Sequence, residues 1–487
     1  MKLLKDILYK VRIDEVVGST HIATEGITMD SREVRPFFLF VAIKGSVSDG
    51  HLFIEKAIEK GANCILCEQL PADLRPEITY VKVSDSAESL GILAANYYDN
   101  PSEKLAVIGI TGTNGKTTVA TLCYELSMAL GHKTGLLSTV VNKVNSQLIP
   151  ATHTTPNAVE LQKLLGQMVE AGCTHVFMEV SSHALDQRRT SGLQFRGAAF
   201  TNITHDHLDY HGTFNAYIHA KKMLFDGLGS KAFAVVNADD RHAEVIVQNC
   251  KGKVYTYALQ SMANYRARII ENALSGLSLT IQHHEVYTQL IGEFNAYNLL
   301  AVYGIAMQLG WDEMSVLTVM STLKAPEGRF QYFRSQTGVI AIVDYAHTPD
   351  ALSNVLDTIN AIRGGNEQLI CVMGCGGDRD AAKRPIMGQI ACAKANKVIV
   401  TSDNPRSEEP KEIIQEIVNG LDPIEKRKVL TMVNRDEAIA AACSLAQPGD
   451  IVLIAGKGHE KYQEIQGVKH PFDDYQMVQE ILKQQAQ

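Results

Sequence analysis

The sequence lacks the apolar segments that carry proteins into or across membranes. No run of about 18 apolar residues, the length of a membrane-spanning helix, occurs in its 487 residues. The amino-terminal segment 1–8 contains two lysines and an aspartate where a signal peptide needs a continuous apolar core. We therefore expect a protein of the cytoplasm with no membrane partner.

The sequence also lacks a basic excess and a complete cysteine motif. Lys and Arg number 46 against 54 Asp and Glu, a net charge of −8, whereas nucleic-acid-binding domains normally carry a basic excess. Nine cysteines are scattered along the chain, and the one CxxC, Cys64 to Cys67, lies in an apolar run without a second CxxC to complete a zinc site. We expect no nucleic-acid partner, a reducing compartment, and no redox or zinc role for these two cysteines.

Alternating strand and helix patterns divide the chain into three α/β regions. A chain of this length accommodates about three domains of ~100–200 residues. Residues 1–103 form a small unit that ends in a linker at 100–102, residues 104–333 form a long central region, and residues 334–487 form a third. Strands followed by a loop and a helix predict parallel sheets, with ligands bound at the carboxyl ends of the strands.

The individual elements follow from the apolar runs and the residues that bound them. We expect strands at 26–29, 37–43, 63–67, 105–110, 175–180, 197–203, 339–344, 368–374, 397–401 and 451–455. Helices are expected at 52–60, from the glycine-rich loop to about 131, and at 214–225, 349–362, 383–395, 410–419 and 436–446.

A glycine-rich loop, Gly109 to Thr118, follows the first strand of the central region. Its sequence GITGTNGKTT supplies glycines whose backbone N–H groups can converge on phosphate oxygens, then Gly115-Lys116-Thr117 for the terminal phosphates and Mg²⁺. The spacing departs from the common phosphate loop, because position 110 is Ile where that pattern has Gly. The alternative is a glycine-rich turn with a chance Lys-Thr. The predicted fold is α/β with three domains: a central P-loop parallel-sheet ATPase domain, a small α/β amino-terminal domain and a Rossmann-like carboxyl-terminal domain.

Acidic and histidine residues end two further strands of the central region. Glu179 stands where NTPases hold Mg²⁺, at a strand end beside a phosphate loop. The segment 202–211 is rich in histidine and either binds a transition metal such as zinc or forms a polar loop with capping residues. Lys221 and Lys222 follow in a predicted helix, where lysine side chains are ordinarily solvated.

Six motifs in order along the chain resemble the Mur ligase family. They are the segments 112–118 (GTNGKTT), 179–182 (EVSS), 202–209 (NITHDHLD), 295–298 (NAYN), 326–329 (PEGR) and 344–349 (DYAHTP). The resemblance covers essentially the whole chain, and the displaced glycine of the phosphate loop is the form found in this family. It implies an ADP-forming acid–amino-acid ligase with ATP and Mg²⁺ as cofactors.

Within that family the chain resembles members that extend UDP-N-acetylmuramoyl-L-alanyl-D-glutamate by its third peptide residue. The closest marks are 30–32 (DSR), 153–156 (HTTP), 376–379 (GGDR), 403–406 (DNPR) and 456–460 (GKGHE). The DNPR form resembles members that add meso-2,6-diaminopimelate, since members that add L-lysine usually lack the arginine. The resemblance implies synthesis of a peptidoglycan precursor through an acyl phosphate, with UDP-N-acetylmuramoyl dipeptide, meso-diaminopimelate and ATP as partners. We expect a monomer.

The resemblance also implies a role for particular residues. ATP would be bound by Gly112, Thr113, Asn114, Gly115, Lys116, Thr117, Thr118, Asn298, Arg329 and Asp344. Mg²⁺ would be held by Thr117, Glu179, His207 and Lys221 as a carbamate, and Lys116, Glu179, His207 and Lys221 would be catalytic. The dipeptide substrate would contact Ser31, Thr154, Thr155, Ser181, Gln187 and Arg189. Diaminopimelate would contact Arg379, Asp403, Asn404, Arg406, Gly456 and Glu460.

Several alternatives stay open at this point. One alternative is the same reaction with L-lysine as the incoming amino acid. Another is that Arg406 only caps a helix or pairs with Glu408 or Glu409. A folylpolyglutamate-synthase-like ligase shares the ATP domain and the acyl-phosphate chemistry. A protein of another class would use ATP only as a switch for binding. A zinc hydrolase built on His205, His207 and His211 would leave the phosphate loop unexplained.

Overall fold

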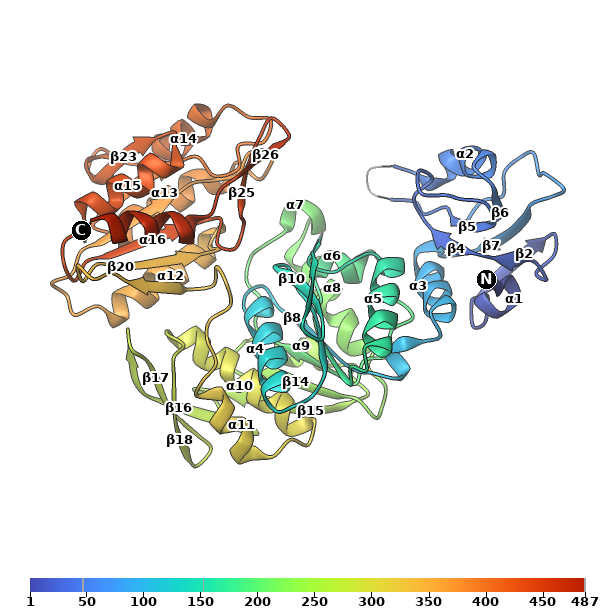
Figure 1. Cartoon of the computed structure of the whole chain (residues 1–487), viewed down its shortest axis with the longest axis horizontal. Coiled ribbons are helices and arrows are strands. Elements are labelled where there is room, and N and C mark those ends of the chain that lie inside the picture. Colours follow the sequence, from blue (N-terminus) through green and yellow to red (C-terminus); the bar gives the residue numbers. More distant parts are fainter. Residues whose placement is uncertain (46–47, 152, 486–487) are drawn as a thin grey trace.

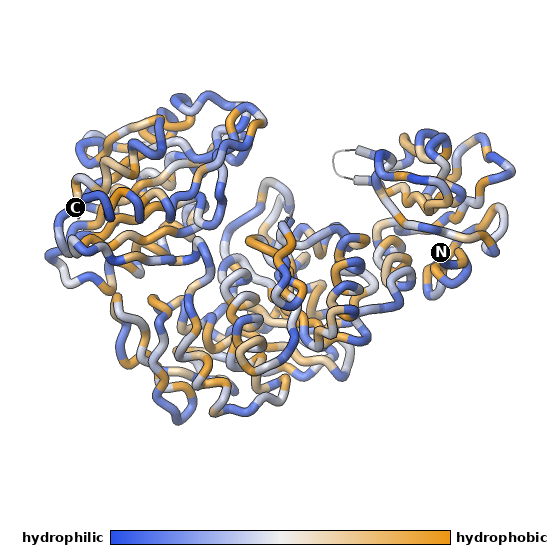
Figure 2. Tube along the Cα trace, in the orientation of Figure 1, coloured by the Kyte–Doolittle hydropathy of each residue, from blue (hydrophilic) through white to orange (hydrophobic). Residues whose placement is uncertain are grey.

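The computed structural model describes residues 1–45, 48–151 and 153–485, apart from the side chain of Asp209. Three regions, each with its own sheet, follow one another along the chain (Figure 1). The amino-terminal and carboxyl-terminal regions both adjoin the central one, and the two ends of the chain lie on opposite sides of the molecule. Figure 2 shows hydrophobic residues concentrated on the strands. In the part of the chain that is described, no helix is long and apolar enough to cross a membrane.

The amino-terminal region holds a five-stranded sheet in the order β2-β7-β6-β5-β4. Strands β4 (Gly26–Thr28), β5 (Phe38–Val41), β6 (Ala62–Cys67) and β7 (Thr79–Val83) are parallel, and β2 (Ile13–Val17) is antiparallel at one edge. Helices α1 (Leu4–Ile7) and α3 (Ser86–Tyr97) share a hydrophobic core with one face of the sheet, and α2 (Ile54–Glu59) packs against the other. A short pair, β1 (Lys2–Leu3) and β3 (Ala23–Thr24), completes the region. The CxxC cysteines lie buried in β6, where burial raises the pKa of both thiols.

The central region is organised by an eleven-stranded sheet in the order β11-β10-β9-β12-β8-β13-β14-β15-β16-β17-β18. Its middle is parallel and comprises β9 (Thr134–Leu137), β12 (His175–Glu179), β8 (Ala106–Thr111), β13 (Gly197–Phe200), β14 (Phe233–Asn237) and β15 (Lys253–Ala258). Antiparallel pairing occurs at both edges. On one side β10 (Val141–Val144) and β11 (Gln147–Pro150) are antiparallel to their neighbours. On the other side β16 (Tyr265–Ala273) still pairs in parallel with β15, and β17 (Gly276–Ile281) and β18 (His284–Thr288) follow it in antiparallel pairs.

Helices cover both faces of this sheet, because successive strand residues point to opposite sides. Val107 of β8 belongs to one core and Ile108 to the other. The Ile108 side packs against α4 (Lys116–Ala129), α10 (Glu293–Gln308) and α11 (Glu313–Met320). The Val107 side packs against α5 (Ala158–Glu170), α6 (Ser182–Asp186), α8 (Phe214–Asp226) and α9 (Ala243–Val247). A single-turn helix, α7 (Leu208–His211), precedes α8.

The carboxyl-terminal region holds a six-stranded sheet in the order β19-β20-β24-β21-β22-β23. Its strands are β19 (Gln331–Arg334), β20 (Ile340–Asp344), β21 (Leu369–Met373), β22 (Lys397–Thr401), β23 (Val429–Met432) and β24 (Ile451–Ala455), all parallel except β19. One face packs against α12 (Pro349–Ile362), α13 (Lys383–Lys394) and α14 (Pro410–Asn419), and the other against α15 (Arg435–Leu445) and α16 (Asp474–Gln484). A hairpin, β25 (Tyr462–Ile465) and β26 (Val468–Pro471), projects from the strand ends.

The predicted α/β class is confirmed, and most predicted elements are present. The strands at 397–401 and 451–455 and the helices at 349–362 and 410–419 have the predicted bounds. The strand predicted at 197–203 ends at Phe200, because the chain then turns into the polar segment beside the phosphate loop. The antiparallel strands at the two edges of the central sheet were not predicted.

Candidate active site

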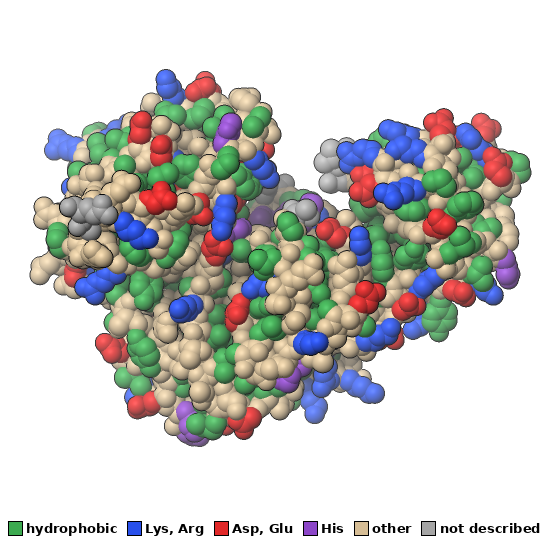
Figure 3. All heavy atoms as spheres, in the orientation of Figure 1, with side chains coloured by type: hydrophobic (Ala, Val, Ile, Leu, Met, Phe, Trp, Pro, Cys, Tyr) green, Lys and Arg blue, Asp and Glu red, His purple; other side chains and the backbone are tan. Residues whose placement is uncertain are grey.

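A cavity of about 1990 Å³ is shared by the central and carboxyl-terminal regions. Figure 3 shows the surface hollowed above the central region. Its walls include most of the residues predicted to bind ligands, namely Thr113, Asn114, Gly115, Lys116, Thr117, Thr118, Thr154, Thr155, Glu179, Ser181, Arg189, His207, Lys221, Asn298, Arg329, Asp344, Arg379 and Glu460. Seven predicted residues are not among its walls: Ser31, Gly112, Gln187, Asp403, Asn404, Arg406 and Gly456.

The phosphate loop joins β8 to α4 and is packed tightly against neighbouring segments. Gly115 has a φ of +87°, in the left-handed region, and a Cβ there would lie 2.6 Å from Oδ1 of Asn298. At Gly112 a Cβ would lie 1.9 Å from Oγ1 of Thr201, so only glycine fits. The Lys116 ammonium folds back and donates to the carbonyls of Gly112 at 3.0 Å and Thr113 at 2.8 Å. The loop thus presents a helix amino terminus and a lysine, the groups that bind phosphate.

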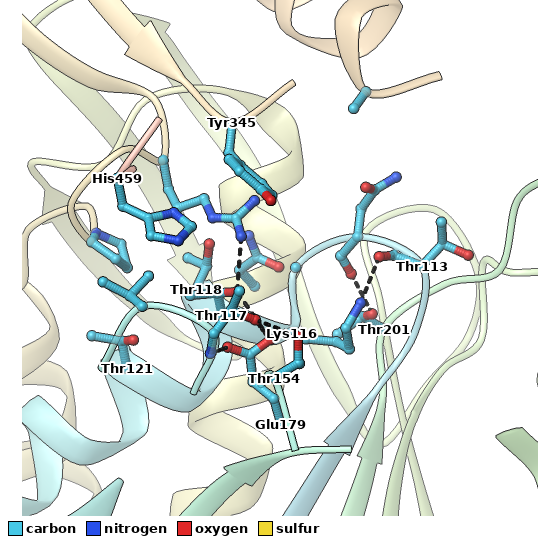
Figure 4. A pocket seen from close by; sticks show the side chains of 18 of the residues that line it. Thr113, Lys116, Thr117, Thr118, Thr121, Thr154, Glu179, Thr201, Tyr345 and His459 are labelled. Carbon is cyan, nitrogen blue, oxygen red and sulfur yellow. Dashed lines mark hydrogen bonds between the residues drawn. The ribbon is translucent and has the colours of Figure 1, made fainter. Parts of the chain in front are cut away.

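Thr117 and Glu179 meet at the floor of the loop (Figure 4). The Thr117 hydroxyl donates to Oε2 of Glu179 at 3.0 Å and accepts from Nη2 of Arg329 at 3.0 Å. The Glu179 carboxylate is fully buried and also accepts from the Thr139 backbone N–H at 2.7 Å. A hydroxyl and a carboxylate beside a phosphate loop are hard oxygen ligands, so these residues fit Mg²⁺.

Lys221 is buried against the phosphate loop, contrary to the expectation of a solvated helix lysine. Its side chain is 1% exposed, and Nζ donates to the Gly112 carbonyl at 2.7 Å and lies 4.6 Å from the ring centre of Tyr217. Burial, together with the nearby positive charge of Lys116, holds the pKa of Lys221 well below its ordinary value. Lys222 is buried too and pairs with Asp226 one turn further along α8. The interpretation of both lysines as solvated was wrong. The phosphate loop, more than 100 residues away in sequence, contacts Lys221, and Lys222 is buried beside Asp226.

The three histidines of the hydrolase alternative do not converge on one point. The ring of His205 stacks on Phe214 with centroids 4.8 Å apart, and Nε2 of His211 lies 3.0 Å from the Ser182 hydroxyl. His207 has a φ of +54° and lies 3.5 Å from a carboxylate oxygen of Asp206. Among the described residues no group of three or more His, Cys, Asp or Glu side chains is arranged to hold a metal ion. The alternative of a zinc site built from these histidines is therefore wrong.

Four residues predicted to hold the dipeptide form a hydrogen-bonded cluster next to Glu179. The Thr155 hydroxyl donates to the Glu179 carbonyl at 2.8 Å and accepts from the Ser181 backbone N–H at 3.2 Å. Arg189 donates to the Thr155 carbonyl at 2.8 Å and to Oε1 of Gln187 at 2.6 Å. Burial lowers the pKa of Arg189. Thr154 adjoins this cluster through Thr139, whose hydroxyl donates to it at 3.1 Å. Ser31 lies apart from this cluster, buried in the amino-terminal region.

The residues predicted to bind diaminopimelate follow the carboxyl ends of three neighbouring strands: Arg379 follows β21, Asp403, Asn404 and Arg406 follow β22, and Gly456 and Glu460 follow β24. Nδ2 of Asn404 donates to Oε2 of Glu460 at 2.7 Å. Gly456 has a φ of +119°, and a Cβ there would lie 2.4 Å from Oδ2 of Asp403. Lys457, which received no role from the sequence, is fully buried and donates to Oδ1 of Asn404 at 2.9 Å and Oε2 of Glu460 at 3.1 Å. Lys457 lies inside the GKGHE motif at 456–460, and this position could have identified it as a residue of the site.

Arg406 does not pair with either of the glutamates considered from the sequence. Its Nη1 donates to the Gly377 carbonyl at 2.8 Å and its Nε lies 3.5 Å from Oε2 of Glu464. Glu408 instead accepts from Arg384 at 2.8 Å. The alternative pairing with Glu408 or Glu409 is therefore wrong within the described contacts, because Arg406 points across to the β25 hairpin. Arg379 is exposed and donates to the Asp378 carbonyl at 3.1 Å.

A buried ion pair that the sequence did not indicate braces these strand ends. Arg435 and Asp474 begin α15 and α16, have fully buried side chains, and meet through two hydrogen bonds of 2.8 and 2.7 Å. The same guanidinium donates to the carbonyls of Ser402 at 3.4 Å and Ala455 at 3.1 Å. These carbonyls immediately precede Asp403 and Gly456. The pair therefore ties together the two segments that carry the predicted amino-acid-binding residues.

The linker between the two regions packs against the loop that carries Glu460. Gly328 has a φ of +67°, and a Cβ there would lie 2.1 Å from the backbone N of His459. Glu327 pairs with Lys461 at 2.7 Å. The Tyr345 ring lies 4.7 Å from the Arg329 guanidinium and 4.8 Å from the His459 ring (Figure 4).

Two titratable groups beside this linker are strongly affected by burial. Nδ1 of His459 is buried without a hydrogen-bond partner, and burial together with Arg329 lowers its pKa to about 3. Burial raises the pKa of Asp344 to about 6, although its Oδ2 accepts from the Phe330 N–H at 2.7 Å. His459 is therefore neutral near pH 7, and Asp344 titrates around pH 6.

Comparison with known proteins places this geometry in a family. Models of the Mur ligase family catalytic domain, the Mur ligase middle domain and the Mur ligase glutamate ligase domain match residues 23–98, 110–306 and 328–458. The chain is 53% identical over 480 residues to a protein of Cytophaga hutchinsonii named UDP-N-acetylmuramoyl-L-alanyl-D-glutamate–2,6-diaminopimelate ligase, covering 98% of this chain and 99% of that protein. A protein of the same name from Bacteroides fragilis is 50% identical, with the same coverage.

Solved structures agree with this assignment. A structure titled as UDP-N-acetylmuramoyl-L-alanyl-D-glutamate–2,6-diaminopimelate ligase matches 100% of this chain and 99% of that one at 33% identity and a TM-score of 0.70. A folylpolyglutamate synthase of Mycobacterium tuberculosis, solved with ADP and AMPPCP, covers 76% of this chain and 92% of that one at 20% identity and a TM-score of 0.62, which shows a shared fold alone. The phosphate loop, the buried carboxylate at its floor and the full-length relatives together show that the chain belongs to the Mur ligase family.

Proposed function

We propose that the chain is an ATP-dependent ligase that joins meso-2,6-diaminopimelate to UDP-N-acetylmuramoyl-L-alanyl-D-glutamate and forms ADP and phosphate. The observation that carries the proposal is one cavity with the phosphate loop on one wall and Arg379 and Glu460 on another. The names of relatives that are 53% and 50% identical support the choice of substrates. We further propose a monomer of the cytoplasm, without a nucleic-acid partner because the net charge is −8.

The chemistry begins with an unreactive carboxylate. Transfer of the γ-phosphoryl group of ATP to the γ-carboxylate of the D-glutamyl residue forms an acyl phosphate and releases ADP. The amine of the incoming amino acid then attacks the acyl carbon, and the tetrahedral intermediate expels phosphate as the amide forms. Anionic reactants meet in the first step, so neutralising their charge is the main task of the protein.

The phosphate loop supplies this neutralisation. Lys116 would leave the carbonyls of Gly112 and Thr113 and turn to the terminal phosphates, while the loop N–H groups bind the others. Thr117 and Glu179 would hold Mg²⁺, which when bound offsets negative charge on the phosphates. Asn298, Arg329 and Asp344 line the same cavity and would contact the nucleotide.

We propose that Lys221 is carbamylated and, with His207, holds a second Mg²⁺. Only a neutral amine reacts with CO₂, forming an N–C bond and losing a proton, and burial of Lys221 favours its neutral form. The product is an anion, which would replace the repulsion between Lys221 and Lys116 with attraction. Tyr217 supports the pairing with His207, since its ring lies 4.6 Å from Nζ of Lys221 and 6.2 Å from the His207 ring.

In the amino-acid pocket, Arg406 would bind the distal carboxylate of diaminopimelate. Asp403, Asn404 and Glu460 would bind the ammonium beside it, and Arg379 would bind the carboxylate next to the reacting amine. L-Lysine lacks the distal carboxylate, so it would leave the guanidinium without its substrate partner.

Phosphate release by the purified protein tests the proposal. We expect release only when ATP, UDP-muramoyl dipeptide and meso-diaminopimelate are all present, with far less release when L-lysine replaces diaminopimelate. A folylpolyglutamate-synthase-like ligase would not require the UDP-linked substrate, and an ATP-gated binding protein would not require an amino acid. Equal release with L-lysine would refute the assignment of diaminopimelate.

Substituting Arg406 tests the pocket itself. Arg406→Lys keeps the positive charge but loses the bidentate hydrogen bonding to a carboxylate. One charged hydrogen bond contributes about 1.5–3 kcal/mol, so kcat/KM for diaminopimelate should fall about 10–100-fold. The KM for ATP should not change. Arg363→Lys is the matched control, because Arg363 lies in the same region and contacts Asn396 and the Glu367 carbonyl rather than any residue proposed to bind diaminopimelate. An Arg406→Lys enzyme with unchanged kcat/KM would refute the role.

A further inference from the structure

The guanidinium of Arg406 already has a carboxylate partner within the protein. Its Nε lies 3.5 Å from Oε2 of Glu464, with the two side chains 22% and 25% exposed. Its Nη1 donates to the Gly377 carbonyl at 2.8 Å, and its Nη2 makes no hydrogen bond with any described residue. Arg406 is therefore held and partly neutralised, with one nitrogen left for a ligand.

The position of Glu464 is fixed by backbone contacts. The β25 hairpin runs alongside the segment that carries Arg406, with the Arg406 N–H donating to the Glu464 carbonyl at 3.0 Å and the Gln466 N–H donating to the Arg406 carbonyl at 2.7 Å. The Glu464 N–H donates to Oδ1 of Asn404 at 2.9 Å. The backbone of Glu464 is thus anchored to two of the residues proposed to bind diaminopimelate, and its carboxylate lies beside the Arg406 guanidinium.

We propose that Glu464 is a resident counter-ion of Arg406 and a determinant of amino-acid selectivity, an inference that rests on the proposed function. The distal carboxylate of diaminopimelate must share or displace Glu464 at the guanidinium, so it approaches a like charge. L-Lysine brings no carboxylate, and Arg406 then keeps Glu464 as its partner. Glu464 therefore weakens binding of diaminopimelate and lowers the penalty for L-lysine.

This arrangement changes the discrimination expected of the pocket. A site whose polar group is left unpaired by the wrong substrate can reject it by factors of ~10⁴. Because Glu464 keeps Arg406 paired, the discrimination against L-lysine should be smaller than that. Removing the charge of Glu464 should increase the discrimination between diaminopimelate and L-lysine. Arg406 would gain affinity for a carboxylate, and with L-lysine bound it would face the ammonium without a partner.

Glu464→Gln tests the proposal in the full-length protein, with phosphate release measured against meso-diaminopimelate and against L-lysine. Partly exposed ion pairs contribute about 1 kcal/mol or less, so we expect the KM for diaminopimelate to fall about threefold to fivefold and the KM for L-lysine to rise by a similar factor. The KM for ATP should stay unchanged. Glu464→Asp, which keeps the charge, should restore values close to those of the wild type.

Asp357→Asn serves as the matched control. It removes a carboxylate from an ion pair with Lys394 in the same region. The described contacts of Asp357 are with Lys394 and Ser353 rather than with Arg406 or Glu464, so both amino-acid KM values should stay unchanged. Circular dichroism establishes that each variant is folded.

Two results for Glu464→Gln would overturn the inference. One is a higher KM for diaminopimelate, which would mean that Glu464 orients Arg406 for binding. The other is that the KM values for both amino acids stay within twofold of the wild type. Absence of diaminopimelate-dependent phosphate release in the wild type would instead refute the proposed function itself.

Discussion

Replacing Asp474 with Asn should destabilise the carboxyl-terminal region selectively. The substitution leaves the Arg435 charge buried without a counter-ion, since both side chains are fully buried. Removing one partner of a buried ion pair costs about 3–5 kcal/mol. With a urea dependence of about 2 kcal/mol per molar, the unfolding midpoint of this region should fall by about 2 M.

The single tryptophan gives the experiment an internal reference. Trp311 lies in the central region and packs against its core, with its ring 5.3 Å from that of His132. Its fluorescence therefore follows unfolding of the central region, whereas far-ultraviolet circular dichroism follows all three regions. In Asp474→Asn we expect the fluorescence midpoint to stay in place while part of the dichroism transition moves to lower urea. A common shift of both signals, or a dichroism shift below about 0.5 M, would refute the reasoning.

A double variant separates the charge from the carbonyl contacts. Arg435→Met combined with Asp474→Leu removes both charges, and buried ion pairs replaced by apolar residues commonly lose little stability. The carbonyls of Ser402 and Ala455 lose their donor, so recovery should be partial. In Asp474→Asn the KM for diaminopimelate should rise with the KM for ATP unchanged. A double variant as unstable as the single one would contradict the charge argument.

Three further predictions concern single residues. Asp344 has a pKa raised to about 6, so the folded state binds its proton more tightly than the unfolded state does. The free energy of unfolding should therefore fall by about 3 kcal/mol as pH rises from about 4 to about 6. In Asp344→Asn, urea titrations across this pH range should show only the change that other groups contribute. Gly456→Ala places a Cβ 2.4 Å from Asp403 at a φ of +119°. The backbone conformation is strained by about 1–3 kcal/mol for a residue other than glycine. In phosphate-release assays the KM for diaminopimelate should rise at least tenfold, while ATP binding persists. If Lys221 carries a carbamate, activity should fall in CO₂-free buffer and return with bicarbonate, and a CO₂-independent rate would count against the modification.

The sequence predicted most of the fold because parallel α/β strands are buried on both faces. Strands such as Lys397–Thr401 and Ile451–Ala455 are continuous apolar runs, and their bounds are visible in the sequence. Strands at the edges of the central sheet were missed. In Tyr265–Ala273, for example, most residues are partly or fully exposed, and polar and apolar residues mix. Their position depends on pairing with the rest of the sheet.

The candidate site was predicted unevenly for a related reason. Residues in contiguous motifs, such as Lys116 and Thr117, were identified because the chemistry is local to the loop. The buried state of Lys221 and the partner of Arg406 depend on contacts across 109 and 58 residues of chain. Arg435 and Asp474 lie outside every recognised motif, and their link to the pocket runs through backbone carbonyls, which leave no trace in residue type.

The packing of the interdomain linker has a consequence for how such ligases can be recombined. Gly328 touches the His459 backbone and Glu327 pairs with Lys461, while Arg329, the next residue, reaches the Thr117 hydroxyl. Residues 327–329 thus contact both the amino-acid-binding region and the phosphate loop. A chimera that exchanges the amino-acid-binding half for that of a relative should be joined before Pro326, so that the linker travels with the loop it fits. A junction placed after Arg334 would take Glu327 and Gly328 from one protein and their partners, Lys461 and His459, from another. The new amino-acid-binding half would then fit poorly against the linker that also contacts the phosphate loop.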